Sequence, residues 1–162
     1  MSVKIIFTGL IILAGFTGFS QDVKKIKITD LEKTIAESKT PLIVNFWATF
    51  CKPCLEEIPY FQEAVKNHKA EGLKLILVSL DLEEMFPKAI KTFASKRRIT
   101  APIQWLDEYN ADYFCPKVDS AWSGAIPATL FINNKTSYRA FFEEQLSSEK
   151  LETVINEMLK KD

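Results

Sequence analysis

The chain has 162 residues, of which 47% are hydrophobic and 26% are charged, a composition typical of one globular domain with a sizeable core. The 21 basic and 21 acidic residues cancel, so no basic excess exists to neutralise the phosphates of a nucleic acid. Short basic clusters such as Lys96-Arg97-Arg98 are interpreted as solvated helix ends. We therefore expect no nucleic-acid partner.

The first 20 residues differ from the rest of the chain. Lys4 is the only charged residue before Asp22, and residues 5–19 form an apolar stretch with small residues toward its end. This pattern predicts a secretory signal peptide over residues 1–20, and hence export to the periplasm or cell envelope. The alternative is an uncleaved membrane anchor at residues 5–19, although this run is shorter than the roughly 20 residues that a spanning helix needs. We expect no other membrane segment.

Residues 21–162 predict one domain in which strands alternate with helices. Apolar runs rich in β-branched residues indicate buried strands, whereas apolar residues spaced three or four positions apart indicate helices. The expected elements are a short alternating patch at 26–28, a helix to about 38, a strand at 41–48, a helix at 52–68, a strand at 73–80, a helix at 84–97, a short strand at 103–106, an irregular stretch at 107–125, strands at 128–132 and 136–142, and a last helix.

Particular residues are expected to begin or bend these helices. Thr29 or Asp30 can cap the first helix, and Ser147 or Ser148 the last. Pro59 should kink the helix at 52–68, because proline has no N–H to donate. The order β-α-β-α-β-α-β-β-α predicts a parallel sheet covered on both faces, with an added antiparallel hairpin, which is an α/β sandwich.

Cys51 and Cys54 lie at the expected junction between a buried strand and a helix. Unpaired N–H groups and the positive end of the helix dipole favour a thiolate at Cys51 over a thiol. Lys52 adds positive potential, and Pro53 suits the first helical turn, where its missing N–H costs little. The pair predicts thiol–disulfide exchange, in which Cys51 attacks a disulfide and Cys54 resolves the mixed disulfide.

Two other interpretations of the cysteine pair remain open at this point. The pair could be half of a structural zinc site, for which Cys115 and His68 are the only further candidates, and neither has the spacing of a ligand pair. The pair could also form an inert structural disulfide, although so small a loop constrains the unfolded chain only weakly. We expect no metal and no cofactor. Cys115 is either a third redox thiol or a free thiol in a packed loop.

Several motifs resemble the thioredoxin superfamily, and the resemblance extends from about residue 24 to the C-terminus. The segment from Val44 to Cys54 resembles the active-site strand and loop of that superfamily, and Pro59 matches the proline in its active-site helix. The resemblance implies a thioredoxin-like three-layer α/β sandwich, with a mixed central sheet and helices on both faces. Phe50 replaces the tryptophan often found before the first cysteine, and residues 107–125 lack the expected helix pattern.

Within the superfamily, the chain is most similar to the exported TlpA-like and ResA-like oxidoreductases. Asn45 stands where thioredoxin has a buried aspartate, and Glu57 matches the active-site glutamate of that branch. The resemblance implies that Glu57 accepts the proton of the resolving thiol, with its pKa raised by burial. It also implies that the Ile126–Pro127 bond is cis and that the Ile126 backbone pairs with an extended substrate segment.

The expected function is that of a protein-disulfide oxidoreductase. Its partners would be substrate proteins with disulfides or thiols, in cytochrome c maturation or cell redox homeostasis, and an upstream thiol protein that donates electrons. Substrate contacts are expected at Phe50, Lys52, Pro53, Ile126 and Pro127, and Trp122 either packs in the interior or lines the substrate groove. The alternatives are a redox-inactive thioredoxin-fold binding module and a peroxiredoxin-type peroxidase. Paired cysteines at a helix start argue against both.

Overall fold

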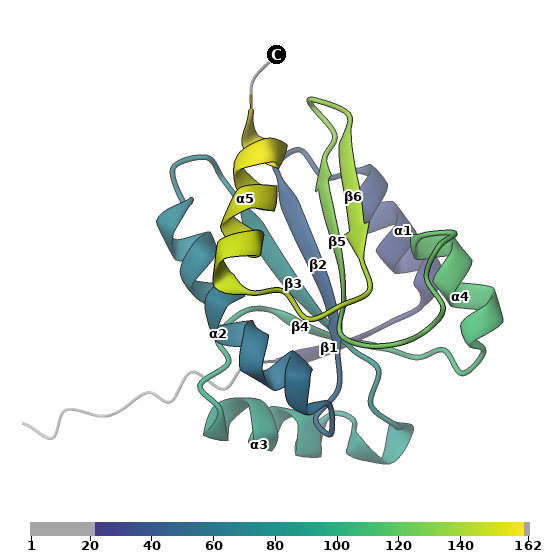
Figure 1. The fold of residues 1–162 in the computed structure, drawn as a ribbon. Coiled ribbons are helices and arrows are strands. Elements are labelled where there is room, and N and C mark those ends of the chain that lie inside the picture. The colour runs from purple at the N-terminus through teal and green to yellow at the C-terminus, as the bar shows by residue number, and fades with distance from the viewer. Residues whose placement is uncertain (1–21, 161–162) are drawn as a thin grey trace, which may run out of the picture.

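The computed structural model describes residues 22–160, so the expected signal peptide at residues 1–20 lies outside the described residues. A single sheet runs through the middle of the domain (Figure 1). Its strands are β1 (Val23–Ile26), β2 (Leu42–Trp47), β3 (Lys74–Ser79), β4 (Ile103–Leu106), β5 (Ala128–Asn133) and β6 (Tyr138–Phe142). Their order in the sheet is β1-β4-β3-β2-β5-β6.

The sheet is mixed, as expected. β2, β3, β4 and β1 pair in parallel, whereas β5 is antiparallel to β2 and β6 is antiparallel to β5. All six residues of β2 are buried, because this strand is central in the sheet and covered on both faces. The loop that follows β2 therefore leaves the sheet from a rigid, buried strand.

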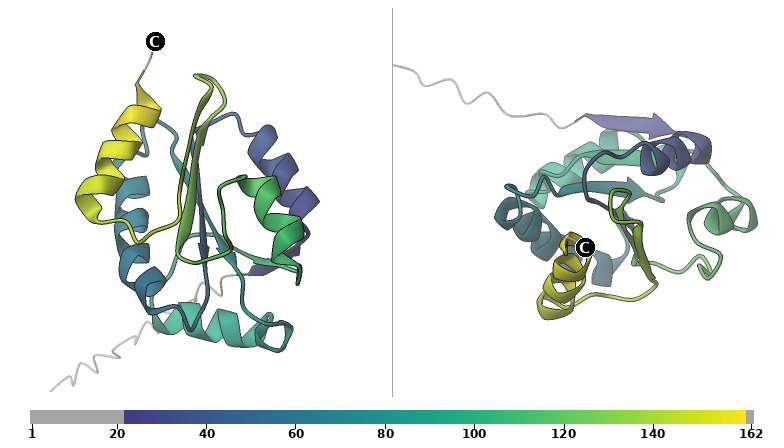
Figure 2. Two further views of the ribbon diagram at one scale, coloured as in Figure 1. Left: turned by 45° about the vertical axis from the view of Figure 1, so that its right-hand side comes forward. Right: turned by 90° about the horizontal axis from the view of Figure 1, so that it is seen from above.

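Helices cover both faces of the sheet, which confirms the three-layer sandwich. The helices are α1 (Ile28–Ala36), α2 (Lys52–Asn67), the short 3-10 helix η1 (Glu83–Met85), α3 (Lys88–Lys96), α4 (Ala111–Val118) and α5 (Ser148–Leu159). α2 and α5 lie on one face, and α1 and α4 lie on the other (Figure 2). No helix within residues 22–160 is both long and apolar enough to cross a bilayer.

Each face has its own apolar core. Phe61 of α2 and Ile155 of α5 belong to one core, which also includes both paired cysteines, and Leu31 of α1 and Phe46 of β2 belong to the other. The expected cap of α5 is confirmed, because the Ser147 hydroxyl accepts a hydrogen bond from the Lys150 N–H. This cap fixes where α5 begins.

The expectation of an irregular stretch at 107–125 was wrong, because α4 forms there. The expected order also contained five strands, whereas the described residues form six. Pro116 lies inside this eight-residue helix, where it removes one backbone hydrogen bond and crowds the preceding turn. Phe114 and Val118 are buried in the core shared with α1, and this packing outweighs the local propensity.

Two further expectations need correction. The helix expected at 84–97 is interrupted by a cis Phe86–Pro87 bond, so that η1 ends before it and α3 begins at Lys88. The N-cap residue of α1 is Lys27 rather than Thr29 or Asp30. The Asp30 carboxylate instead accepts the Lys27 backbone N–H at 2.9 Å, from within the first turn.

Candidate active site

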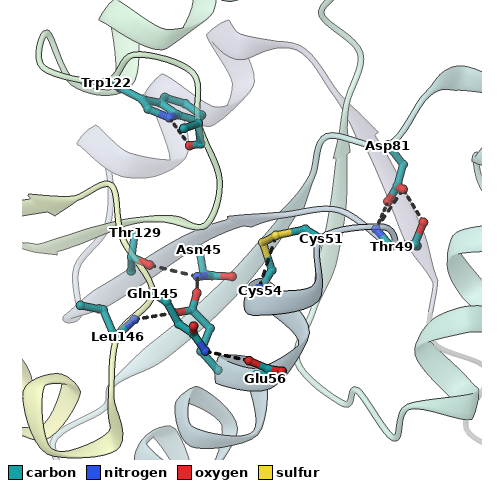
Figure 3. Close-up of a disulfide and its surroundings, with 12 residues drawn as sticks. Asn45, Thr49, Cys51, Cys54, Glu56, Asp81, Trp122, Thr129, Gln145 and Leu146 are labelled. Atoms are coloured by element: carbon teal, nitrogen blue, oxygen red, sulfur yellow. Dashed lines mark hydrogen bonds between the residues drawn. A yellow bond between two sulfur atoms is a disulfide. The ribbon is translucent and has the colours of Figure 1, made fainter.

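Cys51 is the N-cap residue of α2, directly after the loop that leaves β2. Its backbone N–H donates to the carbonyl of Ala48 at 3.1 Å, and its Sγ accepts the Cys54 N–H at 3.3 Å. The structure joins Cys51 and Cys54 in a disulfide with their Cα atoms 5.4 Å apart (Figure 3). Cys54 is fully buried and Cys51 is 7% exposed, so Cys51 is the more accessible residue of the pair.

The position of this disulfide at the start of α2 favours a thiolate at Cys51 once the pair is reduced. A thiolate formed at Cys51 on reduction would lie at the positive end of the α2 dipole, within reach of the Cys54 N–H. Lys52 is exposed beside it and contacts Glu56, with Nζ and Oε1 3.8 Å apart. The Pro53 ring occupies the first turn, where no N–H is needed. Phe50 is 74% exposed, which places an apolar ring on the surface next to Cys51.

Glu57 is a fully buried carboxyl one helical turn beyond Cys54 on α2. One of its oxygens accepts the Leu146 backbone N–H at 2.8 Å, and the other accepts the side-chain amide of Asn45 at 2.8 Å. Burial raises the pKa of Glu57 to about 7, although these two hydrogen bonds pull it in the opposite direction. Glu57 can therefore gain or lose a proton close to neutral pH.

Asn45 connects this carboxyl to the sheet. Its Nδ2 donates both to Glu57 and, at 2.9 Å, to the hydroxyl of Thr129, which lies opposite it in the pairing of β2 with β5. Figure 3 shows the Asn45 side chain between Thr129 and the cysteine pair. One buried amide thus links β2, α2 and β5 beneath the disulfide.

Asp81 holds the other side of the active-site loop. Its carboxylate, just after β3, accepts the backbone N–H of Thr49 at 3.0 Å and the Thr49 hydroxyl at 2.6 Å (Figure 3). The Ser79 hydroxyl donates to the same carboxylate at 2.7 Å. Since Thr49 precedes Cys51 by two residues, these bonds fix the backbone that leads into the helix start.

The Ile126–Pro127 bond is cis, as the resemblance implied. β5 begins at Ala128, whose partner in β2 is Phe46, so Pro127 lies beside the end of β2, where the loop to Cys51 begins. Pro127 is buried and Ile126 is half-buried. The sheet pairing therefore brings a segment more than seventy residues away in the chain to the same edge as the disulfide.

Cys115 lies in α4, in the core on the other face of the sheet from the cysteine pair. Burial raises the pKa of its thiol to about 11, with further contributions from the charges of Glu143 and Asp112. This thiol therefore stays protonated at neutral pH, as expected of a packed free cysteine. Within residues 22–160 no three His, Cys, Asp or Glu side chains are grouped to hold a metal.

Trp122 packs in the interior. Its ring centroid is 4.4 Å from that of Phe46, and its indole Nε1 donates to the Ala125 carbonyl at 2.9 Å.

Three contributors to the site were missed by sequence reasoning. Asp81 could have been found, because a polar residue at the carboxyl end of a buried parallel strand lies at the edge where sites form. Thr129 needed the register of β2 with β5, and the Leu146 N–H is a backbone group that no residue type reveals.

This combination of a mixed sheet, a cysteine pair at a helix start and a cis-proline segment beside it defines a thioredoxin-like domain. Residues 13–140 match the model of the AhpC/TSA family. The chain therefore belongs to that family.

Individual relatives agree with this assignment. The chain is 27% identical over 143 residues to the thiol-disulfide oxidoreductase ResA of Oceanobacillus iheyensis, a match that covers 85% of this chain and 64% of the relative. The chain thus spans less than two thirds of the length of that protein. Among solved structures, a thioredoxin-related protein of Neisseria meningitidis serogroup B has a TM-score of 0.63 at 23% identity, over 75% of this chain and 86% of its own.

A secreted Mycobacterium tuberculosis disulfide oxidoreductase, homologous to E. coli DsbE, has a TM-score of 0.56 at 16% identity, over 74% of this chain and 83% of its own. At these identities the two solved structures show the fold alone. The expected resemblance to the ResA-like branch of the thioredoxin superfamily is confirmed by the ResA relative and the shared fold.

The buried carboxyl of Glu57 predicts an unusual dependence of stability on pH. The ordinary pKa of a glutamate carboxyl is 4.5, whereas the pKa of Glu57 in the folded protein is about 7, so the folded state keeps the proton to higher pH than the unfolded state. Folding stability therefore falls as pH rises between these values, by about 3 kcal/mol in all. Because Glu57→Gln cannot ionise, its unfolding free energy should gain about 3 kcal/mol relative to wild type between about pH 4.5 and pH 8.

Urea unfolding of the oxidised proteins at several pH values measures this difference. Glu56→Gln is the matched control, since Glu56 is exposed on the same helix and its replacement should show little of this trend. Parallel stability curves for wild type and Glu57→Gln across the range would contradict the burial of an ionisable carboxyl at this position.

Proposed function

We propose that the protein is a thiol–disulfide oxidoreductase that reduces disulfides in substrate proteins. The observation that carries the proposal is the Cys51–Cys54 disulfide at the start of α2, in which Cys51 is the more exposed residue and an acid with a pKa of about 7 lies one helical turn beyond Cys54. The similarity to a ResA thiol-disulfide oxidoreductase supports the same activity.

In the proposed reaction, the Cys51 thiolate attacks one sulfur of a substrate disulfide and expels the other as a thiolate. A mixed disulfide then joins Cys51 to the substrate. Cys54 loses its proton and attacks the Cys51 sulfur, which releases the second substrate thiol and forms the Cys51–Cys54 disulfide. Two electrons pass to the substrate, and an upstream thiol protein restores the reduced pair by the same exchange in reverse.

Glu57 is proposed as the group that accepts the proton of Cys54. It lies one turn from Cys54, and its pKa of about 7 lets it be ionised and still basic at neutral pH. Asn45 and the Leu146 N–H hold its two oxygens, so the carboxyl cannot turn away from the helix. Cys51 and Cys54 thus have different roles, and their environments support the difference.

Substrate contacts are proposed around the exposed edge of Cys51. Phe50 and Lys52 are exposed there, Pro53 is half-buried, and the backbone of Ile126 beside cis-Pro127 can pair with an extended segment. An unfolded or flexible polypeptide fits such a site better than a rigid protein surface.

Replacing each cysteine separates the two proposed roles. Cys51→Ser should abolish insulin reduction, because the attacking sulfur is lost, whereas Cys54→Ser should accumulate a mixed disulfide with the substrate. Turbidity of reduced insulin measures the first result, and non-reducing electrophoresis the second. Cys115→Ser is the matched control and should keep wild-type activity. Full insulin reduction by Cys51→Ser would refute the proposal, and so would rapid turnover of hydrogen peroxide without disulfide reduction.

The proton-accepting role of Glu57 predicts an effect on rate. Glu57→Gln should slow thiol–disulfide exchange by about tenfold to a hundredfold at neutral pH and should change how the rate depends on pH. Stopped-flow measurements of Trp fluorescence during reduction of a disulfide substrate, from about pH 5 to pH 9, would report both. Glu56→Gln serves again as the control. An unchanged profile in Glu57→Gln would rule out this role.

Export is proposed on the basis of the apolar stretch at residues 5–19. The secreted Mycobacterium tuberculosis oxidoreductase with the same fold supports it. In such a compartment the substrates would include exported proteins with wrong disulfides and the Cys-x-x-Cys-His segments to which haem is attached during cytochrome c maturation. N-terminal sequencing of the protein recovered from its native host should show a start near residue 21. A start at residue 1 or 2 would indicate an uncleaved anchor instead.

A further inference from the structure

The loop before the cis Ile126–Pro127 bond is held by a carboxylate from another part of the chain. Glu143 directly follows β6, and its Oε1 accepts the Ser123 backbone N–H at 3.1 Å, the Ser123 hydroxyl at 2.6 Å and the Ala125 N–H at 2.8 Å. Its Oε2 lies 3.2 Å from the same Ser123 nitrogen. One side chain therefore satisfies several donors of a loop that has no secondary structure of its own.

The backbone of this loop is shaped to receive a negative charge. Gly124 has a φ of +100°, a conformation that disfavours other residues, and it turns consecutive N–H groups toward one point. Partial burial would raise the pKa of Glu143, but the hydrogen bonds from Ser123, Ala125 and Gly124 outweigh it and hold the pKa below its usual value. Glu143 is thus ionised at neutral pH, when its bonds to the loop are strongest.

The opposite side of the loop is held as well. The Trp122 indole donates to the Ala125 carbonyl at 2.9 Å, and the same ring packs on Phe46 of β2. Ala125 is therefore fixed through its N–H by Glu143 and through its carbonyl by Trp122. Ile126 is the next residue, so its backbone direction is set by these contacts.

We propose that Glu143 is a positioning residue for the substrate, which holds residues 123–125 so that the Ile126 backbone is ready to pair with an extended polypeptide. This inference rests on the proposed function and assigns no chemical step to Glu143. Without the carboxylate, a substrate would have to order the loop when it binds, which weakens binding and leaves the attack by Cys51 unchanged.

The test compares Glu143→Gln with Glu144→Gln. Glutamine has the shape of glutamate, but it lacks the charge that strengthens these hydrogen bonds, and an NH₂ group in the place of Oε2 would face the Ser123 N–H. The neighbouring Glu144 makes its ion pair with Lys150 instead. We expect Glu143→Gln to raise the KM for insulin several-fold with little change in kcat. Its reduction potential and its rate with the small disulfide dithionitrobenzoate should match wild type, since neither needs strand pairing. Glu144→Gln should be normal in every assay.

A second variant separates positioning from simple attraction of charge. Ser123→Ala removes one hydrogen bond to Glu143 without changing any charge, so positioning predicts a smaller rise in KM of the same kind. If Ser123→Ala had a wild-type KM, and if the Glu143→Gln effect disappeared at high salt, long-range charge would explain the result and the proposal would be overturned.

Amide hydrogen exchange reports on the loop without any substrate. The Ser123 and Ala125 amides should exchange several-fold faster in Glu143→Gln than in wild type, while the amides of β2 should not change. An active Glu143→Gln protein with normal KM and normal exchange would overturn the positioning role alone. A wild-type protein that reduces neither insulin nor dithionitrobenzoate would overturn the proposed function, and substrate positioning with it.

Discussion

The burial of one carboxyl, Glu57, is the constraint on which the rest of this site depends. A charged carboxylate in an apolar core is costly unless it is hydrogen-bonded or protonated, and Glu57 meets both conditions in part. Its bonds to Asn45 and to the Leu146 N–H tie α2 to the sheet and to the segment that leads into α5. Because the same side chain lies one turn below Cys54, the contact that joins these elements also places a titratable group beneath the disulfide. The residue whose burial affects stability is thus also the proposed proton acceptor for Cys54, and its ionisation near neutral pH lowers the stability of the fold.

Two other carboxylates also hold segments of the chain in place at this edge of the domain. Asp81 holds the loop that carries Thr49 into the helix start, and Glu143 holds the loop that leads into cis-Pro127. Both loops have irregular backbone, so their N–H groups find no acceptors in a strand pairing or a helix. A carboxylate can accept several of these donors at once, so each loop is fixed without adding regular structure. The disulfide therefore lies between two loops that carboxylates hold in place, at the start of α2 and close to the end of the buried strand β2.

The fold and the centre of the site could largely be predicted from the sequence, because they depend on local signals. Apolar runs predicted the central strands, the helical spacing of apolar residues after Cys51 placed the cysteine pair at a helix start, and the resemblance around Pro127 implied its cis bond. The sequence did not predict α4, where packing of Phe114 and Val118 outweighs a proline, or the break at Phe86–Pro87 in the expected helix. Nor could it predict that Leu146, Thr129 and Glu143 contact the site region, since each contact joins distant parts of the chain through the pairing of β2, β5 and β6.

The most direct test is a titration of the Glu57 carboxyl itself. Carbon-13 NMR of the oxidised protein, with the Glu57 signal assigned by comparison with Glu57→Gln, would follow its ionisation independently of any substrate. We expect a midpoint near pH 7, because burial outweighs the hydrogen bonds from Asn45 and Leu146. A midpoint close to the ordinary value of 4.5 would show that the carboxyl is already ionised well below neutral pH, and would contradict both its proposed role toward Cys54 and its predicted effect on stability.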